Sequence, residues 1–151
     1  MDELFWDKFN YHCELVRTVS RLPYSQYTSL ISYALKQYLR EKHIRLFVSD
    51  DYPMFRGELI KYSFYFFPLN TILLNAKNAI DGFSVWGEGS NKIATALNLV
   101  LCHEIGHSIA FYPELDLSET SAWYEGLELA RKLKVFPDHF CDRLIMRFVG
   151  N

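Results

Sequence analysis

Apolar residues recur at helical spacing near both ends of the chain. Segments 3–20 and 27–42 each place their apolar side chains on one face of a helix, and the same pattern returns over 119–134 and 138–149. In the run 91–111 the apolar residues are so dense that a helix there would be buried nearly all round. The pattern therefore predicts helices at both ends and a buried central helix.

The middle of the chain has the composition of strands. HIRLFVSD (43–50) ends in turn-prone residues, LIKYSFYFF (59–67) is stopped by a proline, and TILLN (71–75) is a short third strand. The segment NAIDGFSVWGEGS (78–90) is expected to be an irregular connection or a fourth strand. Helices, then strands, then helices predict an α+β fold, with a small, mainly antiparallel sheet packed against the buried helix.

Composition limits the classes of protein that this chain can be. Its 151 residues predict one domain over 1–151, and half of them are hydrophobic, which excludes a disordered chain. A net charge of -2 gives no reason to expect nucleic acid as a partner. The acidic N-terminus is unlike a signal peptide, no uncharged apolar run approaches the ~20 residues of a membrane span, and the three cysteines form no CxxC pair. We therefore expect a cytoplasmic protein without a membrane partner.

The buried helix contains the sequence VLCHEIGHSIA (100–110), which includes an HExxH motif. Residues four apart on a helix differ by about 40° in azimuth and about 6 Å in height, so His103 and His107 can reach one zinc ion at about 2.0–2.1 Å. Glu104 is turned about 100° from His103, which suits a general base facing a metal-bound water better than a ligand. Chance would produce this pattern in roughly one such chain in a hundred. The motif predicts a hydrolytic Zn²⁺ site.

Gly106, inside the motif, costs about 1 kcal/mol of helix propensity. A glycine at that place predicts that another element packs closely on the flank of the helix.

A catalytic zinc site usually has a third protein ligand. We expect Glu119, which lies in the first turn of the next predicted helix, to supply it. Asp116 and Glu125 are the alternatives, and Asp116 with Glu119 could instead form a capping pair at the helix start. A donor to the developing oxyanion could come from Tyr112, Tyr124 or His139.

HEIGH followed by an ExxA segment (119–122), in a small α+β domain with a preceding strand like TILLN, resembles the gluzincin metallopeptidases. It is most similar to the compact ImmA/IrrE-type peptidases of bacteria and their mobile elements. The resemblance implies that His103, His107 and Glu119 bind zinc and that Glu104 is the general base. It also implies cytoplasmic cleavage of transcriptional repressors. Trp123 stands where a polar residue often follows in that family.

Zincins typically bind an extended peptide along the edge of their sheet. We therefore expect Thr71, Ile72, Leu73, Leu74 and Asn75 to form an edge strand that holds the substrate, with a central, fully paired strand as the alternative. The predicted function is that of a zinc-dependent endopeptidase with a limited set of protein substrates. The alternatives are a zinc-stabilised regulatory or binding domain with little turnover and, less well supported by the motifs, a deformylase-like amidohydrolase.

Overall fold

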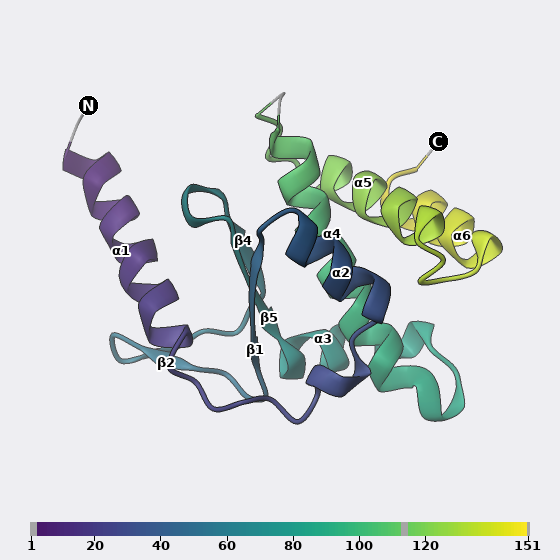
Figure 1. Ribbon diagram of the computed structural model, residues 1–151, viewed down its shortest axis with the longest axis horizontal. Coiled ribbons are helices and arrows are strands. Elements are labelled where there is room, and N and C mark those ends of the chain that lie inside the picture. Colours follow the sequence, from purple (N-terminus) through teal and green to yellow (C-terminus); the bar gives the residue numbers. More distant parts are fainter. Residues whose placement is uncertain (1–2, 113–114, 151) are drawn as a thin grey trace.

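The computed structural model describes residues 3–112 and 115–150 of the chain. Its fold is α+β, as predicted, with helices at both ends and a small sheet between them. Figure 1 shows the sheet between the N-terminal helix on one side and a group of helices on the other. The long helix that carries the HExxH motif runs through that group.

Two helices precede the sheet, as the periodicity predicted. α1 spans Glu3–Val19 and is buried only near its C-terminal end, at Leu15, Val16 and Val19. A short 3-10 turn, η1 (Thr28–Leu30), leads to α2 (Tyr33–Glu41). α2 begins where it does because the side chain of Ser32 caps it, accepting a hydrogen bond from the Leu35 N–H.

The sheet has three strands in the order β1 (Arg45–Ser49), β5 (Thr71–Asn75) and β4 (Phe64–Phe66). β5 is antiparallel to β4 but parallel to β1, so the sheet is mixed and the prediction of a mainly antiparallel sheet is wrong for one of its two pairings. The parallel pair is possible because the chain between β1 and β5 is long enough to cross back. Part of that connection forms a separate antiparallel hairpin of β2 (Met54–Phe55) and β3 (Glu58–Leu59).

The position of β5 contradicts the prediction that Thr71–Asn75 is the edge strand that holds a substrate. Both sides of β5 are paired, and all five of its residues are buried. Leu73 packs toward α1, whereas Ile72 and Leu74 join the core on the opposite face. An uninterrupted apolar strand is typical of a strand covered on both faces, and this is the physical reason for the correction.

Two further stretches differ from the prediction. Over 76–91 the chain forms α3 (Ala76–Phe83) and the 3-10 turns η3 (Ser84–Trp86) and η4 (Gly89–Asn91), with no strand. α3 begins directly after β5 because the side chain of Asn75 caps it, accepting from the Asn78 N–H at 3.1 Å.

The predicted strand 59–67 is interrupted before β4. The Ser63 hydroxyl accepts a hydrogen bond from the Asn75 N–H at 2.8 Å, and the Asn75 side-chain amide donates to the Ile60 carbonyl at 2.9 Å. These bonds satisfy backbone and side-chain groups outside the strand ladder, so the chain between β3 and β4 need not pair as a strand.

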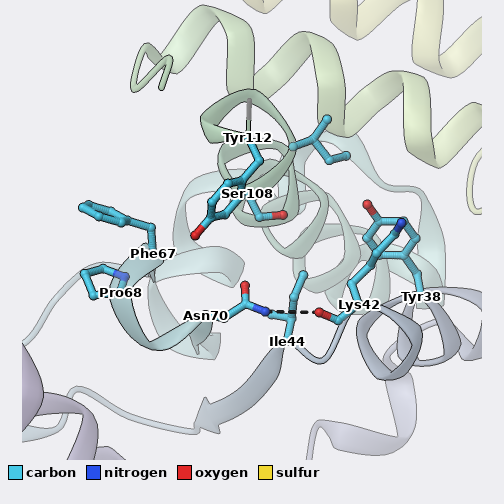
Figure 2. Close-up of a pocket in the computed structure, with 9 residues that line it drawn as sticks. Tyr38, Lys42, Ile44, Phe67, Pro68, Asn70, Ser108 and Tyr112 are labelled. Atoms are coloured by element: carbon cyan, nitrogen blue, oxygen red, sulfur yellow. Dashed lines mark hydrogen bonds between the residues drawn. The ribbon is translucent and has the colours of Figure 1, made fainter. Parts of the chain in front are cut away.

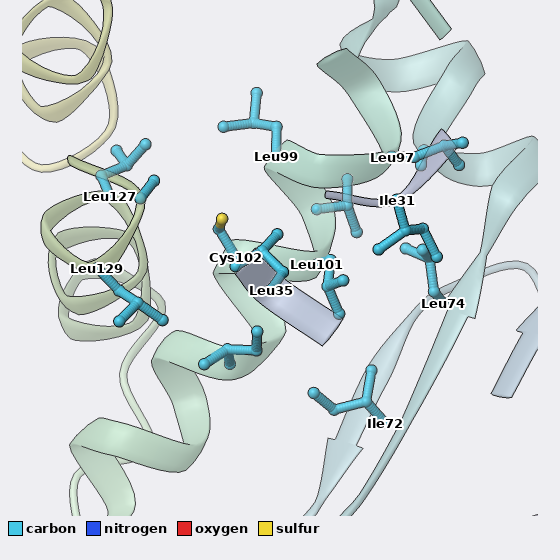
Figure 3. Packing of buried hydrophobic residues seen from close by; sticks show 14 of the residues in the cluster. Ile31, Leu35, Ile72, Leu74, Leu97, Leu99, Leu101, Cys102, Leu127 and Leu129 are labelled. Carbon is cyan, nitrogen blue, oxygen red and sulfur yellow. The ribbon is translucent and has the colours of Figure 1, made fainter. Parts of the chain in front are cut away.

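α4 (Lys92–Phe111) is the core helix, as predicted, and most of its residues from Ala96 onward are buried. By length and composition alone, Gly89–Phe111 could cross a membrane; in the structure this segment lies in the protein core. The buried Asn98 side chain is satisfied by the Ser32 N–H at 2.8 Å and by two carbonyls. Figure 3 shows part of the core around α4, which includes Ile31, Leu35, Ile72, Leu74, Leu97, Leu101, Leu127 and Leu129.

α5 (Glu119–Lys132) crosses α4 in very close contact, and α6 (Asp138–Phe148) follows it. Both helices were predicted. A Cβ atom added to Gly106 of α4 would lie 1.9 Å from the carbonyl oxygen of Ala122. A Cβ atom on Gly126 of α5 would lie 2.2 Å from the carbonyl oxygen of Cys102. The close packing that Gly106 predicted is therefore confirmed, and Gly126 is its counterpart on α5.

Gly126→Ala is expected to destabilise the protein by about 3 kcal/mol, because the added methyl group meets backbone that cannot move without separating the helices. This corresponds to a melting temperature lower by roughly 6–12 °C, measurable by circular dichroism. Gly82→Ala is the matched control, since nothing lies within 4 Å of its added Cβ atom. Equal melting temperatures for the two variants would contradict this account of the crossing.

Candidate metal centre

α4 places the two histidines of the motif side by side. The ring centroids of His103 and His107 lie 4.7 Å apart, and both side chains direct their Nε2 atoms toward the same carboxylate. His103 is buried and His107 is half-buried. The i, i+4 spacing thus places two imidazole donors on one face of α4, at the boundary between the core and the surface.

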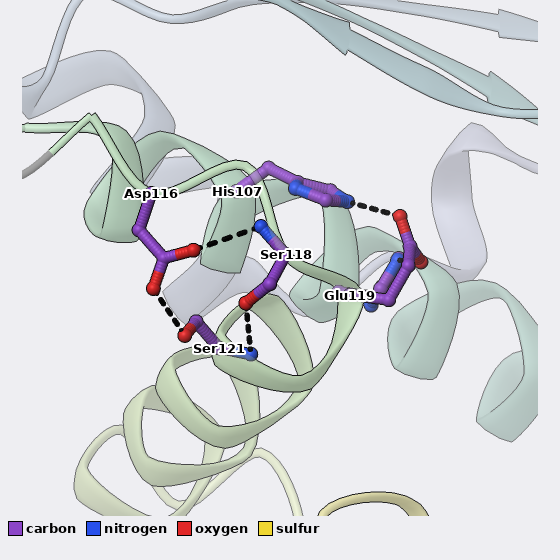
Figure 4. Close-up of polar contacts among 6 residues, drawn as sticks. His107, Asp116, Ser118, Glu119 and Ser121 are labelled. Atoms are coloured by element: carbon purple, nitrogen blue, oxygen red, sulfur yellow. Dashed lines mark hydrogen bonds and ion pairs between the residues drawn. The ribbon is translucent and has the colours of Figure 1, made fainter.

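Glu119, from the first turn of α5, completes the group. One of its carboxylate oxygens lies 2.8 Å from His103 Nε2, and the other lies 3.0 Å from His107 Nε2. Figure 4 shows the carboxylate meeting the His107 ring between the two helices. The three residues can each offer one ligand atom, and these atoms all lie within 4.8 Å of one another.

These distances suit a zinc ion. Tetrahedral ligands at about 2.0–2.1 Å from zinc lie roughly 3.3–3.4 Å from each other, so the carboxylate oxygens would need to move away from the Nε2 atoms by only about half an ångström. The Glu119 side chain is 72% exposed, which leaves it free to make that adjustment. Two imidazoles and one carboxylate are a donor set found in catalytic zinc sites.

The loop before α5 explains why Glu119, and not Asp116, meets the histidines. Asp116 accepts a hydrogen bond from the Ser118 N–H at 2.8 Å and another from the Ser121 hydroxyl, and these bonds lower the pKa of Asp116. The Ser118 side chain caps α5 by accepting from the Ser121 N–H. Asp116 therefore orders the start of the helix (Figure 4), while Glu119 faces the imidazoles.

Glu125, the other alternative, is directed elsewhere. It is turned about 240° around α5 from Glu119, and its charge raises the pKa of Tyr38 on α2, after the larger effect of burial. It is not part of the histidine cluster.

The electrostatics of the site favour a bound cation. Burial, and secondarily the negative charge of Glu119, raises the pKa of Glu104 to about 8. Glu104 is only 5% exposed. Burial also lowers the pKa of His103 to about 4, although Glu119 opposes the change, so this imidazole is neutral at pH 7. Neutral imidazoles are the form that binds a metal, and a cation between the two carboxylates would offset their repulsion.

Trp123 covers the His103 ring on the side of α5. Their ring centroids are 4.2 Å apart with an interplanar angle of 36°. Trp123 is itself stacked on Phe148 of α6 at 4.4 Å and lies 5.6 Å from Phe83 of α3. In the sequence, Trp123 was notable only because it differs from the residue that is common in the resembled family. Its contact with His103 could not be predicted from the sequence and is seen only in the structure.

Comparisons with protein-family models, with curated proteins and with solved structures find no match for this chain. The resemblance to gluzincins stays a prediction based on the HEIGH motif and the ExxA segment. Inferences about function rest on the residues described above.

The structure does not bring the three candidate oxyanion donors to the histidines. Tyr124 is turned about 140° around α5 from Glu119. His139 lines a cavity together with Trp86 and Arg143, and Tyr112 lines a different one at the end of α4. A donor from the described residues would therefore have to come from elsewhere.

The cavity at Tyr112 measures about 490 Å³, yet it is not at the metal centre. Figure 2 shows it between α2, the turn before β5 and the end of α4, with Lys42, Asn70 and Ser108 among its lining residues. Ser108 and Tyr112 lie roughly 140–180° around α4 from His103. The cavity therefore lies around the helix from His103, and neither the two histidines nor Glu119 is among its lining residues.

Proposed function

We propose that the protein is a zinc-dependent endopeptidase of the gluzincin type, most similar to the ImmA/IrrE-type peptidases. The observation that carries the proposal is the convergence of His103, His107 and Glu119 beside the buried Glu104. Two histidines from one helix and a glutamate from the next would hold the zinc. The HExxH spacing supports this assignment independently of the tertiary contact.

Each residue then has a defined role in peptide hydrolysis. A bound zinc would polarise the scissile carbonyl and acidify the attacking water. Glu104 would take the proton from that water and pass it to the amine that leaves. Burial raises the pKa of Glu104 to about 8, close to the working pH, and a bound cation would lower it enough for the carboxylate to accept a proton. His103 and His107 would serve only as ligands.

The substrate is a protein or peptide, and the family resemblance favours a few specific substrates, such as a transcriptional repressor of a mobile element in the cytoplasm. β5 is paired on both sides, so Thr71–Asn75 offers no free strand edge with which an extended substrate could pair.

A second candidate function is a zinc-stabilised regulatory domain with little turnover. One observation favours it: the buried His103 Nδ1 atom has no hydrogen-bonding partner among the described residues. A zinc ligand lacking that support is held less firmly in the geometry that catalysis requires.

Removal of zinc is expected to abolish cleavage. The full chain, loaded with one equivalent of zinc, is incubated with a mixture of peptides from a protein digest, and new termini are identified by mass spectrometry. New termini should appear with zinc, disappear after a chelator and return when zinc is restored.

Two other outcomes are informative. Cleavage that persists after chelation would rule out a zinc peptidase. Stoichiometric zinc without any cleavage, in the digest or in folded candidate repressors, would instead support the regulatory domain.

A further inference from the structure

The His103 imidazole has two nitrogen atoms in different situations. Nε2 faces Glu119 at 2.8 Å, in the place where a metal would be bound. When Nε2 binds a metal, Nδ1 carries the ring proton and must act as a donor. Yet Nδ1 is buried and has no acceptor among the described residues. Metal-binding histidines almost always donate this second N–H to a carboxylate, a carbonyl or water, and the described residues do not supply such an acceptor.

Trp123 makes contact with this ring but cannot replace the acceptor. The indole has one N–H donor and no acceptor atom. The two rings are inclined by only 36°, and the imidazole N–H lies in its own ring plane, so it does not point at the indole face. Stacking can therefore fix the orientation of the ring without satisfying Nδ1.

The indole is well placed to fix that orientation because it is held on its other side. Trp123 stacks on Phe148 with an interplanar angle of 24°, and Phe83 lies against both rings. Three different helices, α5, α6 and α3, thus form one aromatic layer behind His103.

We propose that Trp123 is the positioning residue of the metal centre, holding His103 by stacking in place of a hydrogen-bond acceptor, and that zinc is consequently bound more weakly than an acceptor at this position would allow. The inference rests on the zinc site proposed above. Residue 123 then controls the affinity of the site for zinc. Because binding is weakened, the fraction of sites that hold zinc follows the concentration of available zinc.

The first experiment compares zinc affinities of the full chain by competition with a chelator of known affinity. Trp123→Leu and Trp123→Asn are a matched pair, since both remove the ring and both replacement side chains branch at Cγ, but only asparagine offers an acceptor to Nδ1. Trp123→Phe keeps a stacking ring. We expect Trp123→Phe to bind zinc with an affinity within about threefold of that of the native chain. Trp123→Leu should bind zinc about tenfold more weakly than the native chain. Trp123→Asn should bind zinc at least about tenfold more tightly than Trp123→Leu.

Two results would overturn the inference. If Trp123→Leu binds zinc as tightly as the native chain, the ring does not position His103. If Trp123→Asn binds no more tightly than Trp123→Leu, the unpartnered Nδ1 does not limit affinity. Failure of the native chain to bind zinc at all would instead refute the proposed function, so the two failures are distinguishable.

A second measurement uses Trp123 directly and needs only conservative variants. Binding of Co²⁺, a paramagnetic substitute for zinc, should quench the fluorescence of the indole that stacks on its ligand. Trp123→Phe should lose most of this quenching, whereas the controls Trp6→Phe and Trp86→Phe should retain it. Undiminished quenching in Trp123→Phe would place the metal away from His103 and overturn the inference.

Discussion

Glu104→Gln should retain zinc and lose peptide hydrolysis by about 10³-fold. Glutamine has nearly the same shape as glutamate but cannot accept the proton of the attacking water, and general-base catalysis contributes about 10²–10⁴-fold. Zinc should stay bound with an affinity within about threefold of the native value, because Glu104 is turned about 100° from His103 and does not join the ligand cluster. Folding should not suffer, since the substitution replaces a buried ionisable group by a neutral one.

The measurements are the zinc content of the purified variant and its rate of cleavage of a peptide that the native chain cleaves. Glu125→Gln is the control for the chemical change, because it makes the same substitution on α5 away from the cluster; it should keep both zinc and activity. Cleavage by Glu104→Gln within tenfold of the native rate would show that Glu104 is not the base. Loss of zinc would show that it is a ligand.

Glu119→Ala should weaken zinc binding by about 100-fold or more, because it removes one of three protein ligands. Its carboxylate lies at 2.8 Å and 3.0 Å from the two Nε2 atoms and is mostly exposed, so its loss should cost the fold little. The expected signature is a folded protein with an unchanged melting temperature without metal and a large loss of affinity for zinc.

Asp116→Ala is the matched control, three residues earlier in the same segment. It removes acceptors for Ser118 and Ser121 and should cost about 1 kcal/mol of stability, as the loss of a helix cap does. Zinc affinity should fall much less than in Glu119→Ala, because Asp116 acts only by ordering the start of α5. If Asp116→Ala lost its zinc and Glu119→Ala kept it, the assignment of the third ligand would be wrong.

The parts of the site that could be predicted from the sequence are those governed by local geometry. A regular helix places residues four apart on one face whatever surrounds it, so HEIGH alone implied that His103 and His107 share a face and that Glu104 is turned about 100° from His103. The helices at both ends were predicted for the same reason, because their apolar periodicity is contained within each segment.

The direction of Glu119 depends on packing between two helices. Asp116, Glu119 and Glu125 were all reasonable ligands in the sequence. Glu119 is the one that meets the histidines because Gly106 and Gly126 let α4 and α5 cross almost backbone to backbone. That contact joins residues some twenty positions apart, and no periodicity within either segment specifies it.

The order of the strands in the sheet could not be predicted from local sequence patterns for a related reason. TILLN is compatible with an edge or a central strand until its neighbours are known, and only the pairing with β1 and β4 makes β5 central. The unpartnered Nδ1 of His103 is likewise a property of its surroundings. Spacing along the chain determines which donors share one helix face, whereas the distance between helices determines which third ligand reaches them and which buried atoms lack a partner.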